Sequence, residues 1–251
     1  MTGKRMFIDT SKCTACRACM VSCKQWHSLP AEDTTFTGSY QNPPDLSGAT
    51  LTLIKFTEAE VGDKLRFLFF NNRCRHCQDP RCKMACPRKA IKRQVNGIVR
   101  IDHTLCDPLL CSSDPIYVDR PCQRNCMFKN GGGTGIPKWR YVKDGSPEGA
   151  KMRKCDFCYN RFTNLDLKSP PFVSADGKTK SALPACQVTC PPGAIKSGAA
   201  DAMLTKANNR VNYLKTHGYP NANVYPSPNG IPTHVIWVLV ESPEVYGLMV
   251  T

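Results

Sequence analysis

Cys13, Cys16, Cys19 and Cys23 follow one another near the start of the chain with the spacing C-x2-C-x2-C-x3-C. The first three thiols are close enough in sequence to bind three irons of one four-iron cubane from a single loop. The next helical turn carries the fourth thiol away, and in chains of this spacing that hold two clusters the fourth cysteine binds the other cluster. The segment therefore predicts iron–sulfur chemistry, which is the transfer of single electrons.

The chain has 16 cysteines, and the other twelve form three more groups of four. The second group is Cys74, Cys77, Cys82 and Cys86, the third is Cys106, Cys111, Cys122 and Cys126, and the fourth is Cys155, Cys158, Cys186 and Cys190. Four such groups favour iron–sulfur electron transfer far more strongly than one group would.

Parts of these groups are repeated within the chain. The segment 82–92 matches the segment 186–196 in the pattern C-x3-C-P-x2-A-I-K, and a C-x2-C pair precedes each of them. The segment 8–13 matches the segment 101–106 in the pattern I-D-x3-C. Such repeats indicate an internal duplication of cluster-binding half-motifs.

The duplication predicts an α+β fold of two nested, ferredoxin-like units joined by long loops. The outer unit comprises residues 1–60 and 150–198 and carries the first and fourth cysteine groups. The inner unit, residues 61–149, is inserted within it and carries the second and third groups. Residues 199–251 are expected to form a C-terminal packing extension with a helix and a strand.

Exchange of cysteines between the two groups of each unit predicts four ligand sets, which we call sites 1 to 4. Site 1 is Cys13, Cys16, Cys19 and Cys190; site 2 is Cys155, Cys158, Cys186 and Cys23; site 3 is Cys74, Cys77, Cys82 and Cys126; site 4 is Cys86, Cys106, Cys111 and Cys122. Each site is expected to hold one [4Fe-4S] cluster.

Site 4 depends on the third group, whose spacing C-x4-C-x10-C-x3-C is irregular. The repeats assign Cys106, Cys122 and Cys126, and Cys111 is assigned by elimination. We expect a cluster here because unused thiols beside an electron path are prone to oxidation, and because extra loop residues add little closure entropy. The competing outcomes are a disulfide within this group, or three clusters in place of four.

The formal net charge of the chain is +14. Four clusters would offset about 8 of these charges, since a cubane with four thiolates carries roughly −2. Many basic residues flank the cysteine motifs and can compensate this charge locally; they are Lys12, Arg17, Lys24, Arg73, Arg75, Arg81, Lys83, Arg88 and Lys154. No contiguous basic run is present, so nucleic acid is not an expected partner.

Other interpretations of the cysteines remain open at this point. A C-x2-C pair with a later C-x3-C pair can form a four-thiolate zinc site, which would suit a zinc-rich interaction protein; the three-thiol run and the repeats favour iron. A secreted disulfide framework is disfavoured by the chain length and by the lack of an apolar signal segment in residues 1–12. A free-standing polyferredoxin is the alternative within the iron–sulfur class.

The segments between the cysteine groups predict a strand at 5–9, a loop at 30–49, a buried strand or cluster cover at 66–70, a hairpin with an Asn-Gly turn at 94–101, and a final strand at 234–240. The spacing of Met203, Ala207, Val211 and Leu214 predicts a packing helix ended by Gly218. No apolar run is long enough to span a membrane.

A few residues near the motifs also invite a functional interpretation. The glycine-rich segment 130–135 lacks the Lys-Ser/Thr pair and the following helix of a phosphate loop. Trp26 is expected to pack over a cluster and exclude water from it. His27 and His76 are expected to lie behind the ligands or at the surface, since thiols already fill the sites.

The four groups in this nested order resemble, over nearly the whole chain, the iron–sulfur subunits of the molybdopterin oxidoreductase (DMSO reductase) superfamily. More narrowly, the chain is similar to the beta subunit of formate dehydrogenase. The segments that carry this similarity are CKQWHxxPAE at 23–32, TGSYQNPPDL at 37–46, MxxCDxCxxR at 152–161 and HVIWV at 234–238.

The resemblance implies an electron-transfer subunit without catalytic residues of its own. Formate oxidation or CO2 reduction would take place in a large partner subunit with a molybdenum or tungsten bis-pterin cofactor. Site 1 would face that partner, and the inner unit would face the acceptor, a cytochrome or another redox protein. A subunit of another molybdopterin oxidoreductase is the alternative.

The resemblance also bears on the compartment. Membrane-bound relatives carry a C-terminal anchoring helix that this sequence lacks, which implies a soluble assembly. Export to the periplasm together with a signal-bearing partner is the favoured expectation, and a cytoplasmic enzyme is the alternative.

Overall fold

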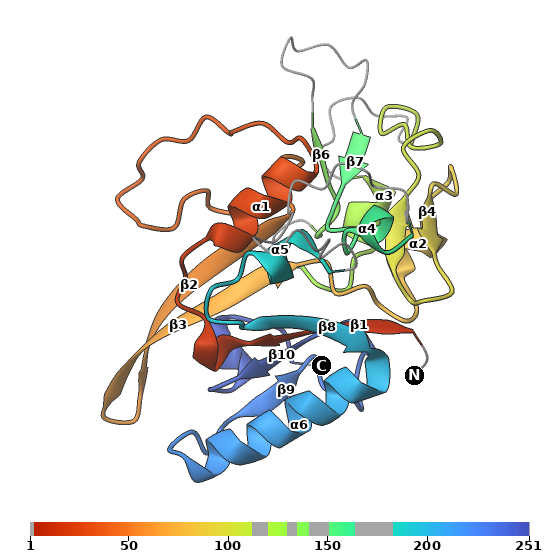
Figure 1. Ribbon diagram of the computed structural model, residues 1–251. Coiled ribbons are helices and arrows are strands. Elements are labelled where there is room, and N and C mark those ends of the chain that lie inside the picture. The colour runs from red at the N-terminus through yellow and green to blue at the C-terminus, as the bar shows by residue number, and fades with distance from the viewer. Residues whose placement is uncertain (1–2, 112–119, 130–134, 141–150, 164–182, 251) are drawn as a thin grey trace, which may run out of the picture.

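The computed structural model describes residues 3–111, 120–129, 135–140, 151–163 and 183–250. These residues form short helices and small sheets, so the expected mixture of helix and strand is confirmed (Figure 1). The strands are β1 (Lys4–Asp9), β2 (Thr52–Val61), β3 (Lys64–Arg73), β4 (Ile91–Arg93), β5 (Val99–Ile101), β6 (Lys138–Arg140), β7 (Lys151–Arg153), β8 (Ile195–Ala199), β9 (Asn223–Tyr225) and β10 (Val235–Leu239). The α-helices are α1 (Ala18–Trp26), α2 (Arg81–Met84), α3 (Pro121–Arg124), α4 (Tyr159–Thr163), α5 (Ala185–Val188) and α6 (Ala200–Thr216), and the 3-10 helices are η1 (Thr10–Lys12) and η2 (Pro243–Tyr246).

One four-stranded sheet joins the two ends of the chain. Its strand order is β8-β1-β10-β9, in which β10 runs parallel to β1 and the outer strands are antiparallel to their neighbours. Every residue of β10 is buried, as its unbroken apolar sequence requires of a central strand. Helix α6 lies along this sheet in Figure 1.

Helix α6 confirms the predicted packing helix. Met203, Ala207, Val211 and Leu214 are all buried, because positions spaced by three and four residues share one helix face. The helix stops just before Gly218, which has a φ of +90°. The strand predicted at 5–9, the loop at 30–49 and the final strand at 234–240 are also found.

The sequence repeats fold alike. Ile8 of β1 pairs antiparallel with Ile195 of β8, and Ile101 of β5 pairs antiparallel with Ile91 of β4. The aspartates that follow make the same bond: the backbone N–H of Asp9 donates to Ala194 O at 2.9 Å, and that of Asp102 donates to Ala90 O at 2.8 Å. Each I-D-x3-C segment is therefore paired with a C-P-x2-A-I segment.

The short helices that carry cysteines pack in pairs. Helix α1 of the first group contacts α5 of the fourth, and α2 of the second group contacts α3 of the third. Segments far apart in sequence thus bring their thiols together, and Figure 1 shows α1 beside α5.

The long hairpin of β2 and β3 corrects one expectation. The segment 66–70 is a strand, but only alternate side chains are covered: Leu68 and Phe70 are buried, whereas Phe67 is 49% exposed. The Phe70 ring packs against that of Trp237, with the ring centroids 5.0 Å apart.

Within the described ranges, no helix is long and apolar enough to cross a membrane.

Two glycines in hairpin turns make a matched stability test. Both Gly62 and Gly97 have positive φ, but a Cβ on Gly97 would overlap the His234 ring, whereas a Cβ on Gly62 would meet nothing within 4 Å. Gly62→Ala should lower the free energy of unfolding by about 1–2 kcal/mol, because alanine is strained in the left-handed conformation. Gly97→Ala should lower it by about 1–3 kcal/mol more, because the added methyl group overpacks the site. Thermal unfolding of both variants measures this; equal unfolding midpoints would contradict it.

Candidate metal centres

The C-x2-C pairs share a backbone feature that the sequence did not reveal. The residue before the second cysteine has a left-handed conformation in three groups, with φ of 54° at Ala15, 50° at His76 and 63° at Phe157. None of these is a glycine, and such residues persist where the surrounding structure determines the backbone strongly. Turns of this kind create concave backbone sites that bind anions, including iron–sulfur clusters.

The cysteines line four separate cavities, with four in each. The lining thiols are Cys13, Cys16, Cys19 and Cys190; Cys23, Cys155, Cys158 and Cys186; Cys74, Cys77, Cys82 and Cys126; and Cys86, Cys106, Cys111 and Cys122. These groupings coincide with sites 1, 2, 3 and 4. The cavities are of similar size, between about 280 and 370 Å³ including the space open to solvent.

The spacing of the thiols argues against single zinc ions. A tetrahedral zinc ion with Zn–S bonds of about 2.3 Å holds its sulfurs about 3.8 Å apart. Among the described residues, His27, Asp156 and Cys158 are the one group of three or more potential ligand atoms that all lie within 4.8 Å of one another. No site therefore has even three sulfurs that close, and the cavities suit a larger, polynuclear group.

Burial makes the free thiols resist ionisation. It raises the pKa values of Cys19, Cys82 and Cys155 to about 12. The positive charge of Arg73 lowers the pKa of Cys19 and of Cys155, but by less than burial raises it. All sixteen cysteines are free thiols rather than disulfides. A bound metal would have to supply the positive charge that stabilises thiolates here, and so would contribute to folding.

Side chains and segments that two sites share give the order of the sites. Arg73, which lines site 2, hydrogen-bonds to Asn71, which lines site 1. Lys154, which lines site 3, donates to the carbonyl of Cys155, a residue of site 2. Cys82 of site 3 and Cys86 of site 4 lie four residues apart, so the sites follow one another from 1 to 4.

Only some of the flanking basic residues can compensate charge inside the protein. Arg73, Arg75 and Lys154 are buried, whereas the others range from half-buried to exposed. Lys154 lines the cavity of site 3 and donates through Nζ to the carbonyls of Val99 and Cys155. Burial lowers its pKa, but the charges of nearby thiols outweigh burial and raise it, so the ammonium stays charged.

Arg120, which the sequence did not single out, lines the cavity of site 4. It is 1% exposed, and its guanidinium carbon lies 4.6 Å from the centroid of the Trp139 ring. Its Nε, Nη1 and Nη2 atoms have no hydrogen-bond partner among the described residues. A buried guanidinium without partners is costly, so this cavity fits an anionic group.

Four other sequence expectations have mixed outcomes. Trp26 is not among the residues lining the four cavities; the Arg161 guanidinium carbon lies 4.4 Å from the centroid of its ring. His27 does not lie behind the ligands: it lines the cavity of site 2, and its Nε2 is 3.2 Å from Asp156 Oδ1. His76 is fully buried, and its Nδ1 accepts the backbone N–H of Val99 at 3.0 Å. Most of the glycine-rich segment, 130–134, lies outside the described residues.

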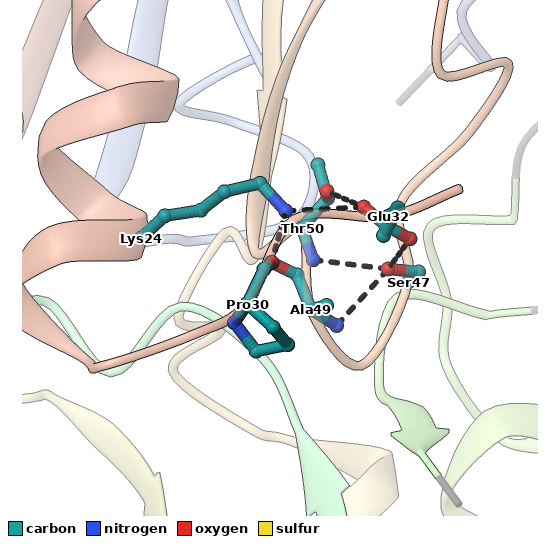
Figure 2. A network of polar contacts seen from close by, with 6 residues as sticks. All are labelled: Lys24, Pro30, Glu32, Ser47, Ala49 and Thr50. Carbon is teal, nitrogen blue, oxygen red and sulfur yellow. Dashed lines mark hydrogen bonds and ion pairs between the residues drawn. The ribbon is translucent and has the colours of Figure 1, made fainter. Parts of the chain in front are cut away.

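A polar network anchors the loop of residues 30–49 to α1 (Figure 2). Lys24, next to Cys23, donates through Nζ to Glu32 Oε2 at 3.2 Å and to Ala49 O at 2.8 Å. The hydroxyls of Ser47 and Thr50 donate to the Glu32 carboxylate. These bonds hold the loop against α1.

Comparisons with known proteins agree with this geometry. A family model for a 4Fe-4S dicluster domain matches residues 65–133. The formate dehydrogenase-O iron-sulfur subunit of Escherichia coli (strain K12) is 35% identical over 243 residues, which are 95% of this chain and 68% of that subunit. Formate dehydrogenase 2 subunit beta (cytochrome c-553) of Nitratidesulfovibrio vulgaris is 34% identical, over 97% of this chain and 96% of that subunit. Formate dehydrogenase subunit beta of Megalodesulfovibrio gigas is 31% identical, over 97% of each.

Clustered thiols and ferredoxin repeats are the mark of iron–sulfur proteins that transfer electrons. Because identities above 30% extend over nearly the whole chain, the chain belongs to the iron–sulfur subunits of formate dehydrogenases. The resemblance inferred from the cysteine groups and the shorter segments is thereby confirmed, and with it the role of an electron-transfer subunit.

The Glu32 network gives a prediction for stability. Burial raises the pKa of Glu32, but hydrogen bonds from Ser47, Thr50 and Lys24 outweigh burial and hold it below its usual value. Glu32→Gln should therefore lower the free energy of unfolding by about 1–3 kcal/mol at neutral pH. Asp33→Asn, at the exposed neighbouring position, is the control.

The same network predicts a pH dependence. Since the folded pKa is the lower one, the carboxylate stabilises the fold fully above the ordinary pKa of about 4.3. This contribution is lost as the pH falls through the folded pKa, so the stability difference between wild type and Glu32→Gln should shrink in acid. Denaturant titrations at a series of pH values measure it, and a difference that grows in acid would contradict the assignment.

Proposed function

We propose that this chain is the subunit of a formate dehydrogenase that holds four [4Fe-4S] clusters, one at each of sites 1 to 4. When bound, each cluster accepts and releases one electron at a time. The protein binds the clusters through thiolates, excludes water from them and compensates their charge with buried cations.

The observation that carries this proposal is the sorting of the cysteines. All sixteen fall into four cavities of four, with none left over. Each cavity combines a C-x2-C pair, or its irregular counterpart, with thiols from a distant segment. This is the pattern expected when the two cysteine groups of a duplicated unit exchange ligands.

Site 4 is supported by Arg120. A disulfide or an empty pocket would leave the buried guanidinium of Arg120 beside neutral groups. A cluster with four thiolates is anionic and would compensate the charge of that guanidinium. The backbone N–H of Ala90 also donates to Cys86 Sγ at 3.3 Å, which suits a thiolate at this position.

The packing supports the nested units. The contact of α1 with α5 joins the two parts of the outer unit, residues 1–60 and 150–198, and that of α2 with α3 lies within the inner unit, residues 61–149. Residues 199–251 complete the main sheet through β9 and β10 and cover it with α6.

The partner in this proposal is a large catalytic subunit with a molybdenum or tungsten bis-pterin cofactor. Once the thiols are assigned as cluster ligands, no cysteine is left to bind that metal, so formate chemistry belongs to the partner. The sites form a linear series, which supports contact with the catalytic subunit at site 1 and with an acceptor at the inner unit. A cytochrome is the favoured acceptor, and the periplasm, reached by co-export, is the favoured compartment.

Iron analysis tests the number of clusters. We expect about sixteen irons per chain, four for each cubane, and about twelve in Cys111→Ser. Leu110→Ala, at the exposed neighbouring position, should keep about sixteen and serves as the control. A wild-type value of about twelve together with a disulfide at Cys106 or Cys111 would refute a cluster at site 4.

Activity of the isolated chain tests the division of labour. The purified subunit, free of any pterin protein, should reduce no dye with formate, and addition of the catalytic subunit should restore the reaction. Formate-dependent dye reduction by the subunit alone would contradict a purely electron-transferring role.

A further inference from the structure

Two side chains on one face of β3 reach the cavities of two different sites. Asn71 lines the cavity of site 1, and Arg73 lines that of site 2. They are two residues apart, so the pleat of the strand directs both to the same side. Both are buried, with 2% and 1% exposure respectively.

Each side chain donates a hydrogen bond to a cysteine sulfur. Asn71 Nδ2 donates to Cys19 Sγ at 3.2 Å, and Arg73 Nη1 donates to Cys186 Sγ at 3.1 Å. Arg73 Nε in turn donates to Asn71 Oδ1 at 2.6 Å. A continuous hydrogen-bonded path therefore joins a thiol of site 1 to a thiol of site 2.

Thr52 closes this path into a ring. Arg73 Nη2 donates to Thr52 Oγ1 at 2.9 Å, and that hydroxyl donates to Asn71 Oδ1 at 3.2 Å. Thr52 is in place because it is paired with Arg73 in the β2–β3 register. Since Asn71 Oδ1 accepts two bonds, the amide is oriented with its N–H2 group toward Cys19.

We propose that Asn71 and Arg73 are positioning residues that raise the reduction potentials of the clusters at sites 1 and 2. This inference rests on the proposed function, which places clusters there. Reduction adds a negative charge to a cluster, and hydrogen bonds to the sulfurs and a nearby positive charge favour the more negative state. The effect is large here because the network is buried, and water screens it little.

The two residues should act on different sites. Asn71 is neutral and contacts only a site 1 thiol among the four cavities' cysteines, so its loss should act chiefly at site 1. The guanidinium of Arg73 donates to a site 2 thiol. A lysine would keep the positive charge but lose the planar fork that makes this bond, so its effect should be chiefly at site 2.

The test is a redox titration of the full chain, followed by electron paramagnetic resonance. Asn71→Leu removes the donor to Cys19 with little change of volume, and Arg73→Lys keeps the charge but not the fork. Lys64→Gln, at an exposed position of the same strand, controls for the loss of a distant charge.

Thr52→Val tests the network even if another variant loses iron. It leaves both sulfur donors in place and removes only the hydroxyl that holds them. Cys16→Ser and Cys158→Ser assign the signals of sites 1 and 2.

We expect Asn71→Leu to lower the equilibrium constant for reduction at site 1 at least tenfold, which is about 59 mV for one electron. Arg73→Lys should do so at site 2, and Thr52→Val should lower both by less. Suppose that all these variants bind about sixteen irons, and that their reduction potentials at sites 1 and 2 shift no more than those of Lys64→Gln. The inference is then wrong, although the proposed function stands. A wild-type chain without iron at sites 1 and 2 would refute the proposed function itself.

Discussion

The gathering of sixteen cysteines in four cavities is the constraint on which the rest of this structure depends. Thiolates in a low-dielectric interior are unstable unless positive charge lies close to them. The fold places buried cations where the cysteines gather: Arg73 at site 2, Lys154 at site 3 and Arg120 at site 4. In the proposed holoprotein these buried cations and the anionic clusters would stabilise each other.

The same constraint accounts for the topology. No cavity is lined by the cysteines of one group alone, so distant segments must meet before any site is complete. The I-D-x3-C and C-P-x2-A-I segments pair as antiparallel strands and so bring distant cysteines together in two places, at β1 with β8 and at β4 with β5. In the outer pair, β10 adds a parallel neighbour to β1 and draws the C-terminal segment into the same sheet.

The cysteine ligand sets are the part of the structure that can be predicted furthest from the sequence, because cluster chemistry fixes the spacing of the thiols. The C-x2-C runs and their repeats predict four ligand sets, and each set lines one cavity, including the set with Cys111; cluster binding by these sets stays a prediction. Asn71 and Arg120 are not predictable in this way. An asparagine in a strand and an arginine before a short helix carry no motif, and their roles depend on which cavity the fold turns them toward. Trp26 was misjudged for the same reason: the aromatic next to a cysteine motif stacks with Arg161 instead.

The exchange of cysteines between distant groups can be tested directly with substitutions at two neighbouring cysteines. Cys186 and Cys190 lie one helical turn apart, on and just after α5, yet line different cavities. Electron paramagnetic resonance of the reduced chain should show Cys190→Ala perturbing the cluster at site 1 and leaving site 2 intact, with the reverse pattern in Cys186→Ala. Loss of the site 2 cluster alone in Cys190→Ala would contradict the pairing of the outer unit.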